Sequence, residues 1–147
     1  MQLSIRTLST LLAASSTVLG RALSTSADTE WTLRSLSRKC DTADSTCTWV
    51  FGIDTGNTTI QNCTYVVKAS TSPPAPASQA NGGPVTCGIY TVTSGWSGQF
   101  GSGKGFTVLS VVDYAKKLIV YAGYTDISVA SGATVEPDLS FPVQTLQ

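Results

Sequence analysis

From Glu30 onward, apolar residues in this chain alternate with polar ones and do not recur at helical spacing. The segment CTWVFGID is apolar at every second position, and CTYVVKA and VTCGIY repeat the pattern. A period of two residues is typical of a β-strand with one buried face, so we expect an all-β protein. The apolar positions are Cys47, Trp49, Phe51, Ile53, Cys63, Tyr65, Val67, Val85, Cys87 and Ile89.

Two later segments, FTVLSVVDY and KLIVYAGY, are apolar on both faces and are joined by YAKK. This pattern predicts a hairpin of central strands whose outer face is also covered, by a helix, a second sheet or another subunit. Two stretches rich in proline, glycine and serine, SPPAPASQANGGP and SGWSGQFGSGKG, are interpreted as loops. The chain therefore predicts an antiparallel small β-barrel or sandwich of about seven to eight strands.

The first residues follow the order of a secretory signal peptide: Arg6, an apolar run from Leu8 to Leu19, and small residues around Gly20 and Ala22. We predict cleavage after Ala22, with cleavage after Gly20 or Ala27 as alternatives. Residues 1–22 would then be the signal peptide and residues 23–147 a single β domain. The apolar run is too short for a membrane span, so the expected location is extracellular.

Four cysteines, Cys40, Cys47, Cys63 and Cys87, belong to a chain expected in an oxidising compartment, which predicts two disulfides. Of the three possible pairings, we favour Cys40 with Cys47, which closes a short loop between two strands, and Cys63 with Cys87, which joins two strands. The chain has no histidine and no CxxC pair, so no metal site is expected.

Charge and sequons give further expectations. Removing Arg6 and Arg21 with the signal peptide leaves nine acidic residues against seven basic ones, so nucleic acid is not an expected partner. The triplets that begin at Asn57 and Asn62 are glycosylation sequons. The second sequon is the weaker, since a disulfide at Cys63 would compete with glycan transfer.

One motif resembles a phosphate-binding loop, because Gly98, Gly103 and Lys104 have the P-loop spacing. However, Gly105 occupies the position of the required Ser or Thr, and a strand follows where a helix is needed. We interpret the stretch as a hairpin loop, with no nucleotide or other cofactor. Its aromatic residues, Trp96 and Phe100, together with Lys104, form a candidate recognition site for a sugar or a protein. The alternative is that the aromatic rings fold back and cap the end of the barrel.

The chain has no histidine to act as a general base, and each cysteine has an expected disulfide partner, so we expect no enzyme. Asp54, Thr55 and Gly56 form the DTG triplet of aspartic proteases, but no second triplet supplies the other carboxylate, and only a homodimer would. A turn is the favoured interpretation. A glycosidase pair among four later carboxylates is possible in principle, although solvated turns are the commoner role; these four are Asp113, Asp126, Glu136 and Asp138.

Several strings together resemble a known family: WTLRSLSRKC, WVFGID, YTVTSGWSGQFGSGKGFTVLSVVDY, LIVYAGYTD and FPVQTL. The chain resembles small secreted fungal proteins that include hypersensitive-response-inducing elicitors of plant pathogens. More distantly, it is similar to the Alternaria major-allergen type of β-barrel. That type carries more cysteines, some of them between subunits, so a covalent dimer is in doubt here.

The resemblance implies an extracellular effector or elicitor that binds a host surface protein or glycan without catalysis. Two alternatives stay open. The first is a module that binds a small ligand or a glycan, and the second is a secreted hydrolase of the DTG type.

Overall fold

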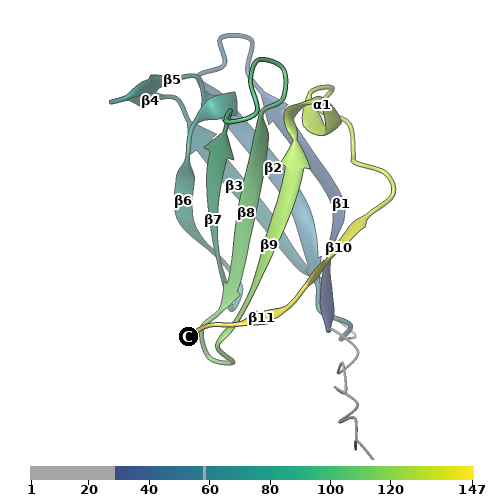
Figure 1. Ribbon diagram of the computed structural model, residues 1–147. Helices are drawn as coiled ribbons and strands as arrows, with labels where there is room; N and C mark the ends of the chain where they lie inside the picture. Colours follow the sequence, from purple (N-terminus) through teal and green to yellow (C-terminus); the bar gives the residue numbers. More distant parts are fainter. Residues whose placement is uncertain (1–28, 58) are drawn as a thin grey trace, which may run out of the picture.

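Two antiparallel sheets face each other in the computed structural model, which describes residues 29–57 and 59–147 (Figure 1). The predicted signal peptide, residues 1–22, lies outside the described residues. The first sheet has the order β10-β1-β2-β3 and the second β11-β9-β8-β7-β6. The strands of the first sheet are β1 (Glu30–Cys40), β2 (Thr46–Asp54), β3 (Gln61–Lys68) and β10 (Leu139–Pro142). Those of the second are β6 (Gly82–Cys87), β7 (Tyr90–Ser97), β8 (Phe106–Asp113), β9 (Leu118–Thr125) and β11 (Gln144–Thr145).

The inner faces of the two sheets form the core, as the alternation predicts. Every second side chain of β2 from Cys47 to Ile53 is buried, and so are Cys63, Tyr65 and Val67 on β3. The hydroxyls of Tyr65 and Ser94 are hydrogen-bonded across the core at 2.8 Å, which links β3 to β7. The pattern fails at Ile89, which is 65% exposed, because β6 ends at Cys87 and residues 88–89 form the turn to β7.

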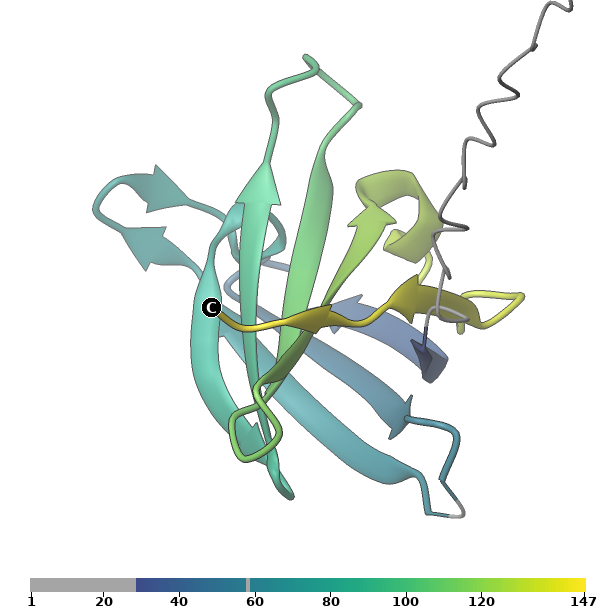
Figure 2. The same ribbon diagram turned by 60° about the horizontal axis from the view of Figure 1, so that its bottom comes forward.

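The structure is a sandwich and not a closed barrel, and the two sheets are linked to each other in a different way along each of their two edges. On one side the Cys63–Cys87 disulfide joins the edge strands β3 and β6. On the other side the C-terminal segment pairs with both sheets, since β10 pairs with β1 and β11 with β9 (Figure 2). The second disulfide, Cys40–Cys47, joins β1 to β2. Both pairings are the ones favoured from the sequence.

The predicted hairpin of β8 and β9 is confirmed, but its outer face is covered only in part. Val112 and Ile119 are buried near the point where β11 pairs with β9, whereas Tyr121 is 49% exposed. Within the described chain, neither a helix nor another sheet lies over the rest of that face, so two of the three predicted kinds of cover are absent from it. Cover by another subunit stays a prediction.

The proline-rich stretch is more ordered than a plain loop. It contains part of a small two-stranded ribbon of β4 (Ser70–Thr71) and β5 (Pro74–Ala75), the 3₁₀ turn η1 (Ala77–Gln79) and the start of β6. Proline has no backbone N–H to donate, and it is tolerated there because many N–H groups of a two-stranded ribbon or an edge strand make no hydrogen bond within a sheet. The glycine-rich stretch is the predicted hairpin loop, residues 98–105, between β7 and β8. In the described part of the chain, no helix has the length and apolar character needed to cross a membrane.

Candidate binding site at the loop end of the sandwich

Four connections gather at one end of the sandwich, at the top of Figure 1: the β1–β2 turn, the β4–β5 ribbon with η1, the loop of residues 98–105, and the short helix α1 (Asp126–Val129). We call this end the loop end. The β2–β3, β6–β7 and β8–β9 turns lie at the opposite end, which we call the far end. The candidate recognition residues lie at the loop end.

The glycines of the loop explain how Trp96 is seated. A Cβ at position 98 would lie 2.6 Å from Cη2 of the Trp96 ring, and one at position 105 would lie 2.9 Å from its Nε1. The Cβ at position 105 would also lie 2.2 Å from Oδ2 of Asp126. Glycine at 98 and 105 therefore lets the indole pack against the backbone, whereas Gly101 and Gly103 adopt φ values of 100° and 73° that suit glycine. Glycine is needed at position 105 because the Trp96 indole and the Asp126 carboxylate occupy the space of a side chain.

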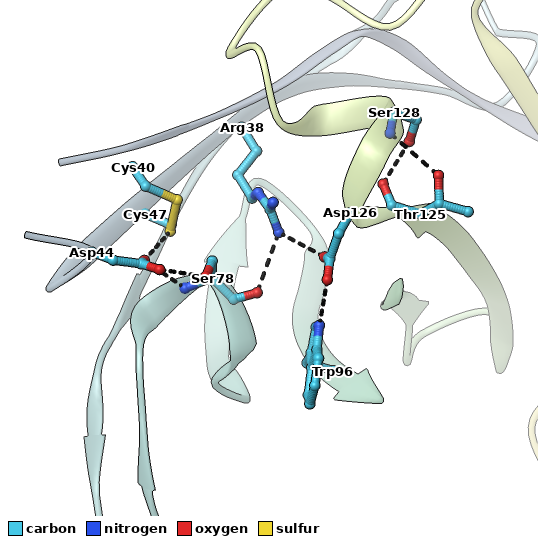
Figure 3. Close-up of polar contacts among 9 residues, drawn as sticks. All are labelled: Arg38, Cys40, Asp44, Cys47, Ser78, Trp96, Thr125, Asp126 and Ser128. Carbon is cyan, nitrogen blue, oxygen red and sulfur yellow. Dashed lines mark hydrogen bonds and ion pairs between the residues drawn. A yellow bond between two sulfur atoms is a disulfide. The ribbon is translucent and has the colours of Figure 1, made fainter. Parts of the chain in front are cut away.

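Asp126, the first residue of α1, fixes the indole ring to β1 (Figure 3). Trp96 Nε1 donates to Asp126 Oδ2 at 2.9 Å, and Arg38 Nη1 donates to Asp126 Oδ1 at 3.2 Å. The same Nη1 donates to the carbonyl oxygen of Ser78 at 3.3 Å. Arg38 is only 6% exposed, and its Nε has no hydrogen-bond partner among the described residues. Asp126 is therefore the counter-ion that compensates the buried positive charge of Arg38.

Further contacts hold this network in place. The Arg38 guanidinium carbon lies 5.4 Å from the ring centroid of Trp49, a cation–π distance. The backbone N–H of Trp96 donates to Asn81 Oδ1 at 2.9 Å. Thr125 caps α1, because its Oγ1 accepts from the N–H of Ser128 at 3.2 Å. These contacts hold the backbone of Trp96 and the two residues that position its indole, Arg38 and Asp126.

Asp44 in the β1–β2 turn fixes η1 beneath the site. Its Oδ1 accepts from the N–H of Ser78 at 2.8 Å, and its carbonyl oxygen accepts from the N–H of Ala77 at 2.8 Å. Asp44 also lies close to the sulfurs of Cys40 and Cys47. Those sulfurs are bonded to each other and the carboxylate is engaged by Ser78, so this group is structural and not a metal centre.

Two hollows flank Trp96. The first, about 370 Å³, lies against the glycine-rich loop and is lined by Gln79, Trp96, Ser102 and Asp126 with the loop glycines. The second, about 390 Å³, lies beside the ribbon and is lined by residues that include Ser70, Ser72 and Asn81, and again by Gln79 and Trp96. We call them the loop hollow and the ribbon hollow. Trp96 and Gln79 belong to both, so they stand between the two.

A larger hollow of about 710 Å³ lies elsewhere, against the outer faces of β1 and β2. Its lining includes Ser37, Lys39, Thr48 and Val50 and no aromatic side chain. It is an open sheet surface whose one carboxylate, Asp41, already accepts hydrogen bonds from Ser45. We therefore place the candidate site at the loop end despite the smaller volumes there.

The structure places the three predicted recognition residues on one hairpin but in different environments. Trp96 is half-buried, so its ring lies between the two predicted arrangements, an exposed recognition ring and a ring folded back onto the protein. Phe100 is 64% exposed and stacks on Phe106 with ring centroids 5.7 Å apart, and Lys104 is exposed. The recognition role of all three stays a prediction. Sequence reasoning missed Arg38 and Gln79, and it placed Asp126 only among possible turn carboxylates.

The DTG triplet forms a turn at the far end. Asp54 Oδ1 accepts from the N–H of Gly56 at 2.9 Å, and Oδ2 accepts from Arg34 Nε at 2.9 Å. The Gly56 hydrogen bond and then the Arg34 side chain lower the pKa of Asp54 below its usual value. An aspartic protease dyad needs a carboxyl that shares a proton, so this environment opposes that chemistry.

Both sequon asparagines are exposed and lie away from the loop end. Asn57 is in the β2–β3 turn, and Asn62 is on the outer face of β3, next to the inward-pointing Cys63. Glycosylation at these positions stays a prediction.

Comparison with known proteins adds a family match. The family model described as Effector TSP1 matches residues 32–146. A curated protein named Effector TSP1, from Hypocrea virens, is 54% identical over 112 residues, which cover 76% of this chain and 74% of that protein.

Proposed function

This chain belongs to the Effector TSP1 family of fungal effectors, and on that premise we propose that it is secreted and acts without catalysis, by binding a host surface through the loop end. The observation that carries the proposal is the position of Trp96 between two hollows. The half-exposed ring is held by Asp126, which accepts from its Nε1, while Asn81 holds the backbone N–H of the same residue, so Trp96 loses little conformational freedom on binding. Such a ring is typical of the centre of a binding surface.

The exposed neighbour Phe100 supports the same surface. It projects from the glycine-rich loop and keeps most of its ring in solvent. A large exposed aromatic side chain on a loop that a rigid scaffold positions is characteristic of recognition surfaces. The far end offers a matched comparison, because Tyr114 in the β8–β9 turn is 65% exposed.

Binding of the labelled protein to suspension-cultured plant cells tests this proposal. We expect saturable binding that Phe100→Ala weakens by about thirtyfold, as loss of a hot spot worth about 2 kcal/mol would. Tyr114→Ala should leave the affinity unchanged. Equal losses in the two variants, or cell binding that never saturates, would show that the loop end is not the contact surface.

The DTG protease is the weaker alternative, since Arg34 and the Gly56 N–H favour the ionised form of Asp54. A glycan-binding module is compatible with the proposal, because a host surface carries glycans as well as proteins.

A further inference from the structure

The chemistry of the two hollows narrows the class of partner. We propose that the loop hollow and the ribbon hollow form one groove that takes a linear, neutral glycan, with one sugar ring against Trp96 and a neighbour in each hollow. This inference rests on the proposed function, because it names the partner class of the same surface. Each hollow has a volume within the range of about 300–1,000 Å³ found for ligand pockets.

Unused hydrogen-bonding groups converge on the groove. Gln79 is exposed, and its side-chain amide makes no hydrogen bond within the described chain. Asn81 uses its carbonyl oxygen to hold Trp96, which leaves its amide N–H groups available. Each carboxylate oxygen of Asp126 accepts one hydrogen bond and has a second lone pair. Serine hydroxyls at 70, 72 and 102 add further donors and acceptors.

An indole beside amide and carboxylate groups suits a sugar ring. The C–H face of a hexose packs on an aromatic ring, while its hydroxyls donate to a carboxylate and exchange hydrogen bonds with amides. The ribbon hollow and the loop hollow meet at Trp96 and Gln79, so a chain of at least three sugars would contact both. A single small molecule would use only one hollow.

Charge and shape oppose the other classes. Among the residues that line the two hollows there is no lysine or arginine, and Asp126 is acidic. Lys104 is exposed on the same loop but is not part of the lining, so an anionic polymer in the groove would face a carboxylate with no cation beside it. The aliphatic lining is limited to alanine and proline, so the hollows offer little to hold a leucine or phenylalanine side chain of a protein. A neutral glycan fits both restrictions.

Titration of the full protein with three neutral hexasaccharides, cellohexaose, laminarihexaose and chitohexaose, tests this inference. Trp31 and Trp49 are buried, so a change in indole fluorescence would report mainly on Trp96. We expect at least one of the three to bind saturably with such a change, and an oligomer of galacturonic acid, which is anionic, not to bind.

Variants of two exposed glutamines locate the binding. Gln79→Ala should weaken hexasaccharide binding at least tenfold, whereas Gln99→Ala, in the same end of the molecule but outside the groove lining, should not. Neither variant removes a side-chain contact of the core. Equal affinity of the Gln79 variant, binding of the galacturonate oligomer alone, or no binding of any neutral chain would overturn the inference. The proposed function would survive these results if cell binding still depended on Phe100.

Discussion

At the scale of single residues, Asp126 joins segments that are far apart in the sequence. It accepts hydrogen bonds from Trp96 on β7 and from the buried Arg38 on β1, and Arg38 also reaches Ser78 in η1. Gly105 makes room for this arrangement, because any side chain there would meet both Asp126 and the indole ring. The geometry of the site therefore depends on a residue without a side chain.

Replacing that glycine tests the arrangement. Gly105→Ala should lower the free energy of unfolding by about 1–3 kcal/mol, since its Cβ would force Trp96 or Asp126 to move. Urea unfolding measures the change, and indole fluorescence should show whether Trp96 shifts. Gly123→Ala is the control, because a Cβ on that β9 residue meets nothing within 4 Å. If the two alanine variants unfold alike, Trp96 is not seated as described.

Asp54 gives a prediction for acid. Its pKa in the folded protein is lowered by the Gly56 N–H and by Arg34, so the ionised carboxylate stabilises the fold at pH values above about 4. That contribution is lost as the pH falls through the lowered pKa. The free energy of unfolding should therefore drop on acidification from pH 5 toward pH 2, and Asp54→Asn should reduce the drop. Parallel curves for the two proteins would contradict this.

At the scale of elements, the strands and the glycine-rich hairpin loop were predictable, whereas the shortest elements were not. Alternation predicted β2 and β3 because one side chain in two enters the core, and the period is visible without knowing the partner strand. It failed at Ile89, where the chain turns after Cys87. The ribbon β4–β5 and helix α1 are too short for any period to appear.

The site could be predicted only in its local part. Trp96 stood out within a glycine-rich loop, but Asp126 and Arg38 are separated from it by 30 and 58 positions. Asp126 reaches Trp96 because β7 and β9 flank β8 in one sheet, and Arg38 reaches Asp126 because the two sheets pack face to face. A buried arginine on a strand looks like a solvated one until its ion-pair partner is known.

The disulfides differ in what they hold. Cys63–Cys87 closes a loop with a sequence separation of 24 and fastens two edge strands, whereas Cys40–Cys47 has a separation of 7 and joins strands already paired. Loop entropy alone predicts that replacing Cys63 and Cys87 by alanine costs about 1 kcal/mol more than replacing the other pair. Urea unfolding of the two double variants measures this, and an equal or reversed cost would be contrary to the fold described.

At the scale of the whole molecule, the loop end combines a fixed aromatic ring, adjoining hollows and unused polar groups. The predicted glycosylation positions lie elsewhere, Asn57 at the far end and Asn62 on the outer face of β3. Glycans there would leave the loop end accessible. The two sheets and their fastenings act as a scaffold for that surface.

Hydrogen exchange measured by mass spectrometry, with the protein free and bound to plant cell-wall material, tests whether the loop end is the binding surface. Binding through the loop end should slow exchange in the loop of residues 98–105 and in residues 70–79, because both segments border Trp96. The β8–β9 turn at the far end should exchange at an unchanged rate. Protection at the far end or along the outer face of β1 and β2, with residues 98–105 unaffected, would contradict binding through the loop end.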